Sequence, residues 1–465
     1  MRLHPYMAKM YSVSQYVISD DQKDLFSWCD IMCRKAKLLS NAATFRLRQH
    51  YTAYGKEEAD LQPAQLEVEE EIRRTIASTG MTAPGRQIGY AFLEKLMRVN
   101  QNSDFFGGLP MQAAQHVLKM RTGDFASWAA ACRSYQKNPS LFTGRPKMPH
   151  YVRGDLTTVC FTNQDCRMNY KDGTPYLKLP MTDAVVLLGR VPSQGRMKEV
   201  KVVPFYEKFR ILVTFEETVN MSLPQGTHAG AIDLGIDNIA AFVSNDGSPS
   251  ILYKGGYLKS RNQWYNKQMG ACRSTLMGGH DPKAYRCPTT KMMQSLGRNR
   301  ALQMRDELHK ISSDIVRQCR IRHIRYLVIG RNKFWKQKTG MSKQSSQNFV
   351  QIPLYSLIRM IRYKAERAGI VVIEQEESYT SKASFLDQDD IPVYGKNDAN
   401  VSFSGERIKR GLYRSKNGTV INADLNGAAN ILRKAMPFAF AGITDFSFLQ
   451  NIRVMNFKDF HDCMA

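Results

Sequence analysis

The sequence predicts an α/β protein of several domains: an α-helical region, a run of short antiparallel strands, and a unit that mixes strands with helices. Three observations support this fold class. The chain has 465 residues, more than one hydrophobic core normally serves. Apolar residues make up 43% of it, which is enough to build folded cores. Their spacing changes along the chain, from helical periods to alternation and then to a mixture of both.

The first part is predicted to be mostly helical. The stretch YSVSQYVIS at residues 11–19 alternates like a single strand, and a helical pattern starts after Ser19, which suits a helix cap. From Leu25 onward, apolar residues recur at three- and four-residue steps until about Ser134, with two polar interruptions. We therefore expect a helical domain over residues 20–138.

Residues 139–225 are predicted to form a small antiparallel barrel. Short strand-like segments joined by turns follow one another here: TTVCFT, YLKLP, AVVLLGRV, EVKVVPFYE and FRILVTFEE. The early strand in residues 1–19 can complete this barrel. In that arrangement the helical domain is an insertion between two strands of the barrel.

The next unit, from residue 226, begins with three strands and then alternates helices with strands. The strands are expected at residues 229–234, 239–244, 251–253, 326–330 and 370–374. This order predicts an RNase H-like sheet with parallel central strands. The helix expected over Arg298–Cys319 carries an apolar stripe at three- and four-residue steps, as a helix that covers such a sheet requires.

The chain is strongly basic and has no membrane-spanning pattern. Its 66 Lys and Arg against 42 Asp and Glu give a net charge of +24, which favours a polyanionic partner, although some basic surfaces are incidental. No apolar run approaches the roughly 18 residues of a membrane span, so we expect a cytoplasmic protein without a membrane partner. Nine cysteines without a C-x-x-C pair argue against a disulfide framework and a four-cysteine zinc site.

Two aspartates stand where a sheet of this kind places its chemistry. Asp233, in GAIDLGIDNIAAF, ends an apolar strand, and Asp424, in INADLNGAANILRK, starts the last predicted helix. Cleavage of a phosphodiester by two divalent ions needs several carboxylates that converge on those ions, and carboxylates suit Mg²⁺ or Mn²⁺. For Asp424 a second interpretation stays open, because an aspartate near a helix start is often only a cap.

The third acid is not specified by the strand that should carry it. That strand ends at Gly330, without a carboxylate. The neighbouring strand, in GIVVIEQEESYTS, offers Glu374, Glu376 and Glu377 at its carboxyl end. Adjacent strands lie only about 5 Å apart, so a glutamate can reach across. Alternation puts Glu374 and Glu376 on one face and Glu377 on the other, which leaves the choice open.

At these residues the chain resembles the TnpB family, the RNA-guided nucleases of insertion sequences that are related to compact type V CRISPR effectors. The resemblance runs from about Gly144 to Ile431 and is weaker in residues 1–140. Its segments occur in the family's order: GRPKMPHY, GAIDLGIDNIAAF, LHKISSDIV, VIGRNKFWKQ, NFVQIPLYSLIRMIRYKAERAGI, ESYTSKAS and INADLNGAANI. It implies a RuvC nuclease domain of RNase H fold, a β-barrel wedge domain and an inserted α-helical recognition domain.

Two departures from the family matter. The family's usual second-motif glutamate is Gly330 here, as in a subgroup whose glutamate has moved to the later strand, so the resemblance carries the site to Asp233, Asp424 and either Glu376 or Glu377. The paired cysteines of the family's zinc ribbon are absent after ESYTS, so we predict no zinc. In their place we expect a loop that brings cations and aromatic residues near the site: Tyr394, Phe403, Arg407, Lys409 and Arg410.

The resemblance also divides the chain into domains and names its partners. The expected domains are the wedge barrel (1–19 and 139–225), the recognition domain (20–138), the RuvC-like domain (226–377 and 416–436) and the loop without zinc (378–415), while the tail (437–465) has no interpretation. The expected partners are a guide RNA and double-stranded target DNA, with two Mg²⁺ or Mn²⁺ ions, in a prokaryotic cell and at its nucleoid. We predict a monomer, with a dimer on one RNA as the alternative.

Nucleic-acid contacts are expected from basic, aromatic and amide side chains, although each one can also be an ordinary solvated residue. The candidates are Arg145, Lys147, Tyr151, Arg153, Asn332, Lys333, Trp335, Lys336, Arg407, Arg410, Gln112 and Gln115.

The predicted function is therefore an RNA-guided, Mg²⁺-dependent DNA endonuclease. Two alternatives stay open. Gly330 is compatible with a guided DNA-binding repressor that has lost cleavage. The second alternative is an unguided nuclease for branched DNA. The large basic region that precedes the nuclease domain argues against it, because such a nuclease does not need that region.

Overall fold

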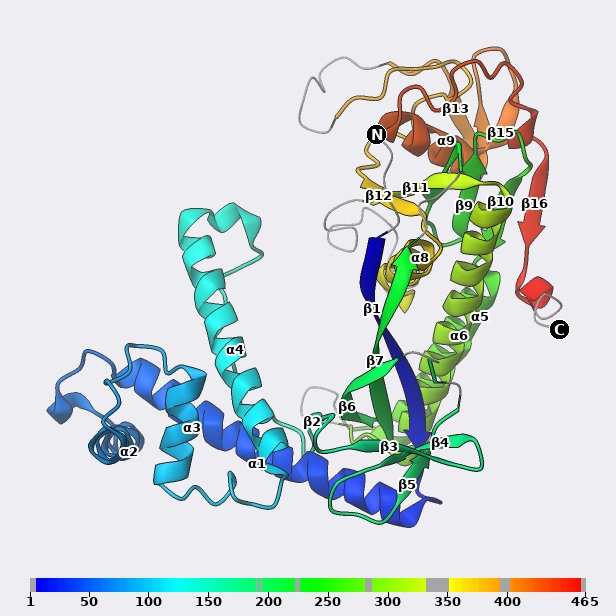
Figure 1. Ribbon diagram of the computed structural model, residues 1–465. Coiled ribbons are helices and arrows are strands. Elements are labelled where there is room, and N and C mark those ends of the chain that lie inside the picture. The colour runs from blue at the N-terminus through cyan, green and yellow to red at the C-terminus, as the bar shows by residue number, and fades with distance from the viewer. Residues whose placement is uncertain are drawn as a thin grey trace. The chain divides into compact units, whose positions relative to one another are not determined.

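The computed structural model describes residues 6–189, 191–192, 195–221, 226–280, 287–331, 351–393 and 402–460. The chain forms two compact units (Figure 1). The N-terminal unit is Lys9–Val219, and the C-terminal unit comprises the chain from Asn220 onward together with the first few residues. No helix in the described ranges is both long and apolar enough to cross a membrane.

The N-terminal unit contains four α-helices where the helical periods predict them. They are α1 (Lys23–Ala53), α2 (Pro63–Thr79), α3 (Tyr90–Val99) and α4 (Met111–Lys137), with the short 3₁₀ turns η1 (Glu58–Asp60) and η2 (Pro139–Leu141). The buried side chains of α1 begin at Leu25 and recur at helical spacing along its length. A buried ion pair, Arg46 Nη2 to Glu71 Oε1 at 2.6 Å, joins α1 to α2.

The strands of the N-terminal unit form two sheets. The larger has the order β1-β7-β6-β2, from β1 (Tyr6–Ile18), β7 (Lys208–Met221), β6 (Arg196–Phe205) and β2 (Val159–Thr162). The smaller has the order β3-β4-β5, from β3 (Arg167–Lys171), β4 (Thr174–Lys178) and β5 (Val185–Leu187). Because β1 pairs with β7, the four helices lie in sequence between two neighbouring strands of one sheet. Closure of the two sheets into one barrel stays a prediction.

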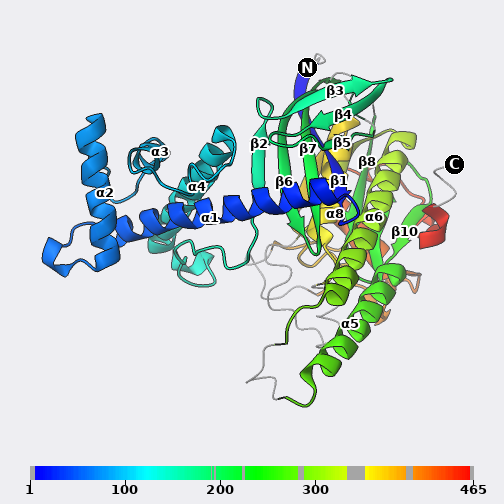
Figure 2. The same ribbon diagram turned by 90° about the horizontal axis from the view of Figure 1, so that it is seen from below.

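One apolar core joins the helices and both sheets of this unit. Trp28 of α1 stacks on Phe161 of β2, with ring centroids 5.3 Å apart, and its Nε1–H donates to the carbonyl of Pro180 at 2.8 Å. The long helix α1 runs from this core out to α2 and α3 (Figures 1 and 2). The helices and sheets of this unit are therefore packed as one body.

The C-terminal unit is built on a six-stranded mixed sheet of order β12-β11-β8-β9-β10-β16. The strands follow the five predicted segments closely: β8 (His228–Asp233), β9 (Asn238–Ser244), β10 (Ser250–Lys254), β11 (Ile324–Gly330) and β12 (Val371–Gln375). β8, β11 and β12 are parallel to one another, and β9 runs antiparallel to both of its neighbours. The carboxyl ends of β8, β11 and β12 therefore meet at one edge of the sheet.

Helices cover both faces of this sheet. Leu327 and Ile329 of β11 face a core that includes α6 (Lys291–Ile321) and α8 (Leu354–Arg367), while Val328 faces a second core with α9 (Ala423–Ala435). Side chains of a strand alternate between faces, so α9 lies opposite α6 and α8. Another helix, α5 (Gly256–Met277), packs along α6 (Figures 1 and 2).

The segment before α9 and the C-terminal tail add structure that the sequence patterns did not predict. A small antiparallel sheet, β13 (Glu406–Lys409), β14 (Leu412–Arg414) and β15 (Val420–Asn422), leads directly into α9. In the tail, β16 (Ile452–Met455) joins the large sheet parallel to β10, between the 3₁₀ turns η4 (Ser447–Leu449) and η5 (Phe457–Phe460).

Candidate functional site

Asp233 is the last residue of β8, at the edge where the parallel strands end. It lies opposite Ala241 of β9. Burial raises the pKa of its carboxyl group well above the ordinary value, and the negative charges of Glu377 and Asp424 raise it further. The fold therefore places Glu377 and Asp424, from distant parts of the sequence, within electrostatic reach of Asp233.

A glycine in α9 gives the carboxylate of Asp233 its space. A Cβ atom added at Gly427 would lie 2.7 Å from Asp233 Oδ2. Gly427 is buried, and so are its neighbours in α9, Asn426 and Ala428. The small residues after Asp424 therefore allow the helix to approach the end of β8, as their sequence predicts.

Asp424 is not the cap of α9. The N-cap is Asn422, whose side chain accepts hydrogen bonds from the backbone N–H groups of Asp424 and Leu425, at 2.9 and 3.2 Å. The carboxylate of Asp424 points to other partners: Asn238 Nδ2 donates to its Oδ2 at 2.7 Å, and Arg407 Nη2 lies 3.4 Å from its Oδ1. The interpretation of Asp424 as a simple cap is therefore wrong.

Of the three glutamates at the carboxyl end of β12 and just after it, Glu377 faces the end of β11. Its Oε2 lies 2.7 Å from the position that a Cβ atom would take at Gly330. Burial raises the pKa of Glu377 to about 7, and the charge of Glu376 adds to this effect. Its carboxylate thus occupies space beside the residue where the sequence lacks an acid.

The other two glutamates are engaged with cations elsewhere. Lys434 Nζ donates to Glu376 Oε2 at 2.7 Å, and the Ser378 N–H donates to Glu376 Oε1, also at 2.7 Å. Burial works against ionisation of Glu376, but these hydrogen bonds outweigh it and lower its pKa. Glu374 forms ion pairs with Arg331 and Arg362. The geometry therefore separates Glu377 from its neighbours, a choice that alternation left open.

A cationic cavity of about 470 Å³ adjoins Asp424. Lys254, Arg407 and Arg410 line it, together with Asn238 and Asp237. Asp237 is held by ion pairs with Arg410, at 2.7 Å, and with Lys259, and these cations outweigh burial and lower its pKa. The cavity therefore brings positive side chains to the edge of the acidic site, and Asp237 serves to hold two of the surrounding cations.

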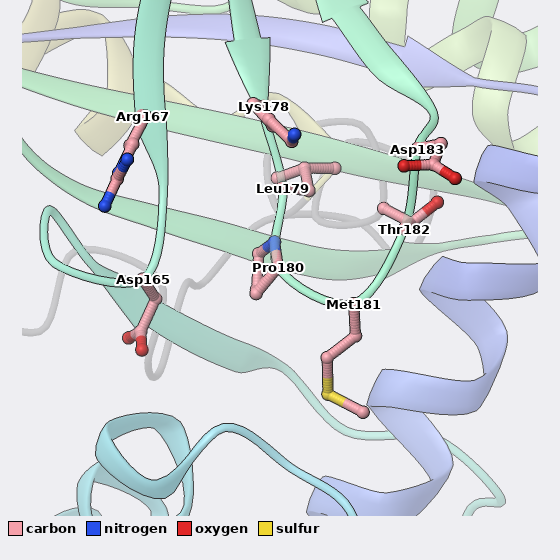
Figure 3. Close-up of a pocket in the computed structure, with 8 residues that line it drawn as sticks. All are labelled: Asp165, Arg167, Lys178, Leu179, Pro180, Met181, Thr182 and Asp183. Carbon is pink, nitrogen blue, oxygen red and sulfur yellow. The ribbon is translucent and has the colours of Figure 1, made fainter.

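A second cavity, of about 520 Å³, lies in the N-terminal unit around the turn after β4 (Figure 3). Arg167 and Lys178 line it, but so do Asp165 and Asp183. Its charges balance, so it does not concentrate positive charge as the cavity beside Asp424 does.

The remaining predicted nucleic-acid residues fall into three groups. Arg145, Lys147 and Arg153 are exposed in the N-terminal unit, and Arg48 lies over the ring of Tyr151 at 5.8 Å. Gln112 accepts a hydrogen bond from Thr162 Oγ1 at 2.6 Å, and Gln115 Nε2 donates to Glu94 at 3.5 Å, so both amides have partners within the fold. Four candidates lie outside the described residues: Asn332, Lys333, Trp335 and Lys336. Tyr394, expected in the loop near the site, also lies outside them.

Three side chains of the site were missed by sequence reasoning: Asn238, Lys254 and Lys434. Asn238 lies inside the motif that contains Asp233, so its position in that motif was a usable signal. Lys254 and Lys434 carry no local signal, because a lysine at a strand end or in a helix's last turn is usually solvated.

Family models match two parts of the chain. A model described as a probable transposase, OrfB_IS605, matches residues 211–336, and the TNB domain of Cas12f1-like proteins matches residues 355–431. The first contains Asp233, and the second contains Glu377 and Asp424.

Two kinds of relatives agree with these models. The TnpB-like protein ORF457 of Acidianus two-tailed virus is 25% identical over 225 residues, which are 47% of this chain and 44% of that protein. The match therefore spans less than half of the viral protein's length.

Among solved structures, a Cas12f1–sgRNA–target DNA complex aligns with a TM-score of 0.51 at 11% identity, over 91% of this chain and 98% of that chain, which shows a shared fold. The C2c1 protein of Alicyclobacillus acidoterrestris, solved with single-guide RNA, aligns at 9% identity over 85% of this chain and 69% of that one. Its TM-score is 0.30, too low to show a shared fold. The two family models and the viral relative support a TnpB-family protein, and the Cas12f1 complex shows that the chain shares its fold.

Proposed function

We propose that this protein is an RNA-guided DNA endonuclease whose RuvC-like site is formed by Asp233, Glu377 and Asp424. The observation that carries the proposal is the position of the Glu377 carboxylate, 2.7 Å from where a Cβ would stand at Gly330. It supplies an acid beside the strand end that lacks one. The family's relationship to guided nucleases supports the activity.

The order of the large sheet supports an RNase H-type nuclease domain. Three antiparallel strands, β8 to β10, are followed by β11 and β12 parallel to β8 on its other side. In sheets of this kind, ligands bind beyond the carboxyl ends of the parallel strands. Asp233 and Glu377 lie at this edge, and α9 brings Asp424 to it.

The three acids suit a pair of divalent cations such as Mg²⁺ or Mn²⁺. Oxygen donors of this type are those that such ions prefer. Among the described residues, no group of three or more His, Cys, Asp or Glu side chains is already placed to hold a metal ion together. Burial, and then the charges of Glu377 and Asp424, raise the pKa of Asp233, and the positive charge of a bound cation would offset both effects. The fit therefore rests on the chemistry of the three carboxylates; such ions when bound supply an activated water and stabilise the leaving oxygen.

The side chains around the acids would prepare them for this role. Gly427 and Gly330 leave room for the carboxylates of Asp233 and Glu377. Lys434 holds Glu376 away from the site and thereby fixes the turn that directs Glu377. Arg407 and Arg410, beside the acids, offer positive charge to a phosphodiester backbone that enters the neighbouring cavity.

The proposed partners are a guide RNA and a double-stranded DNA target. The Cas12f1 relative was solved with sgRNA and target DNA, and the net charge of +24 suits both polyanions. Guide pairing would read the sequence while cations hold the heteroduplex backbone. We propose Arg145, Lys147, Tyr151 and Arg153 for such backbone contacts, with Arg407 and Arg410 nearer the acids, and no zinc in residues 378–415, which contain no cysteine.

The direct test is purification from the host followed by sequencing of any bound RNA, then cleavage of a DNA target that matches its variable part. We expect a discrete RNA, cleavage in Mg²⁺ or Mn²⁺, and loss of cleavage in Asp233→Ala and Asp424→Ala with RNA and DNA binding retained. Asp445→Ala, in a surface turn where the carboxylate accepts hydrogen bonds from Ser447, is the matched control.

Other outcomes would point to other functions. Programmed DNA binding without any nick would indicate a guided repressor. Cutting of branched DNA without RNA would indicate an unguided nuclease. Cleavage that survives Asp424→Ala would overturn the proposed site.

A further inference from the structure

Asn238 holds the carboxylate of Asp424 from inside the fold. It is the first residue of β9 and is only 5% exposed. Its Nδ2 donates to Asp424 Oδ2 at 2.7 Å. This contact joins the start of a strand to the first turn of α9. A buried amide that bonds to a charged oxygen makes one of the stronger kinds of hydrogen bond.

Lys254 determines which way the amide of Asn238 faces. Lys254 Nζ donates to Asn238 Oδ1 at 2.9 Å. A lysine has donors and no acceptor, so the amide oxygen must face Lys254 and the NH₂ group must face Asp424. The two residues are paired between β10 and β9 where the register shifts after Tyr253. The strand pairing places Lys254 beside Asn238, and this neighbour fixes the orientation of the amide.

The two oxygens of Asp424 consequently have unlike surroundings. Oδ2 is held by the buried amide of Asn238. Oδ1 faces Arg407, whose side chain is 46% exposed and whose Nη2 is 3.4 Å away. An exposed ion pair at this distance is worth little, so a ligand can displace the arginine. Oδ1 is thus the oxygen that an incoming cation can reach.

We propose that Asn238, oriented by Lys254, is a positioning residue that presents Asp424 Oδ1 to a divalent cation. This inference rests on the proposed function. The position needs an acceptor toward Lys254 and a donor toward Asp424, and an amide supplies both. An apolar residue would leave both partners without their hydrogen bonds and would free the carboxylate to rotate. Asn238 and Lys254, which line the cavity beside Asp424, then serve to position a metal ligand, whereas Arg407 and Arg410 in the same lining offer positive charge to a phosphate.

If Asn238 had only a structural role, replacing it would lower stability without affecting the binding of a cation. Asn245 provides the control for this possibility. Asn245 follows the other end of β9, where its Nδ2 donates to the Ala439 carbonyl at 2.6 Å and its Oδ1 accepts from the Ala229 N–H at 2.8 Å. Asn245→Ala therefore removes a similar pair of hydrogen bonds without touching an acid. It should lower thermal stability as much as Asn238→Ala does.

The experiment measures Mn²⁺ binding to the full chain with its bound RNA, by the electron paramagnetic resonance signal of free Mn²⁺. Wild type should retain Mn²⁺ that Asp424→Ala loses. Asn238→Ala should weaken that binding about 10- to 100-fold, the usual effect of removing an outer partner of a metal ligand. Lys254→Met should act in the same direction and less strongly, while Asn245→Ala should bind as wild type does.

A second readout follows the rate of cleavage against Mg²⁺ concentration. Asn238→Ala should raise the Mg²⁺ concentration needed for half the maximal rate by about the same 10- to 100-fold. At saturating Mg²⁺ its rate should approach that of wild type. A reduced rate with unchanged Mg²⁺ dependence would overturn the positioning role.

The outcomes separate the inference from the function on which it rests. If Asp424→Ala loses Mn²⁺ while Asn238→Ala binds as wild type does, the inference fails and the site assignment stands. An equal loss of binding in Asn245→Ala would likewise reduce Asn238 to a structural role. If wild type and Asp424→Ala retain equal Mn²⁺ and cleave equally, the proposed site and the inference both fail.

Discussion

The carboxylate of Glu377 lies 2.7 Å from the point where a Cβ atom would stand at Gly330. A side chain at the end of β11 and the carboxylate that follows β12 therefore exclude each other. The glycine is not simply a missing acid, because its small size creates the space that the later glutamate fills. This exclusion underlies the first two predictions.

Glu377→Gln should reduce DNA cleavage about 100-fold or more, whereas Glu376→Gln should stay within about tenfold of wild type. The reason is that the charge of Glu377 acts on Asp233 and raises its pKa, while Glu376 bonds to Lys434 and Ser378. Cleavage rates at saturating guide RNA and Mg²⁺ measure this difference. Full activity in Glu377→Gln would refute the relocation of the third acid.

Gly330→Ala should destabilise the protein by about 1–3 kcal/mol and should lower cleavage. The added methyl would meet Ile431 Cδ1 at 2.5 Å as well as Glu377 Oε2 at 2.7 Å. Urea unfolding measures the stability. Gly270→Ala in α5 is the control, since nothing lies within 4 Å of its added Cβ, and there alanine should stabilise the helix by up to about 1 kcal/mol. Equal behaviour of the two variants would contradict the steric argument.

Gly427→Ala should weaken Mn²⁺ binding, although alanine is normally the better helix residue by about 1 kcal/mol. Its Cβ would lie 2.7 Å from Asp233 Oδ2 and would push that carboxylate from its position. Mn²⁺ titration with the Gly270→Ala control separates this effect from helix propensity. Unchanged binding would show that Asp233 can move without cost.

Lys434→Met should destabilise the protein by about 1–3 kcal/mol, because it leaves polar groups without their charged donor. Lys434 Nζ donates to Glu376 Oε2, to the Ser378 carbonyl at 2.9 Å and to the Pro392 carbonyl at 3.2 Å, and its side chain is 7% exposed. Cleavage should fall as well, since Glu377 follows Glu376 directly. Thermal unfolding and cleavage measure the two effects, with exposed Lys458→Met as the control. A loss of stability without a loss of cleavage would show that Lys434 does not orient the side chain of Glu377.

Without divalent cations, stability should fall as the pH rises through the raised pKa of Glu377. Burial first, and then the charge of Glu376, raise the pKa of Glu377 to about 7 from the ordinary 4.5. Between these values the folded chain holds a proton that the unfolded chain has released, so folding is favoured below about pH 4.5 and loses this contribution by about pH 7. Asp233 acts in the same direction, because its pKa is also raised.

Thermal unfolding in a chelating buffer at several pH values measures this dependence. Glu377→Gln should flatten it over the same range, whereas Glu376→Gln should not, since the pKa of Glu376 is lowered. A melting temperature that rises steadily from about pH 4.5 to 7 and does not respond to Glu377→Gln would contradict the raised pKa.

Much of the C-terminal unit was predictable because its signals are local. Apolar strands separated by turns placed β8 to β12 within about two residues, since burial on both faces requires continuous apolar runs. β16 was not predicted, because Ile452–Met455 is short and becomes a strand only by pairing with β10. The sheet β13-β14-β15 was missed because its strands are also short and because their residues are largely exposed, so they show no apolar pattern.

The sequence by itself predicted Asp233 and Asp424 as candidate acids, and it determined the absence of an acid at Gly330 and the basic character of the chain. Only the tertiary structure distinguished Glu377 from Glu376 and Glu374. β12 ends at Gln375, so the alternation of a strand no longer directs the two later glutamates. Their directions depend on Lys434, Ser378 and the empty space at Gly330, which come from other elements. Contacts between distant segments of the chain, and not local periodicity, decide where each of the three carboxylates lies, and they place that of Glu377 beside Gly330.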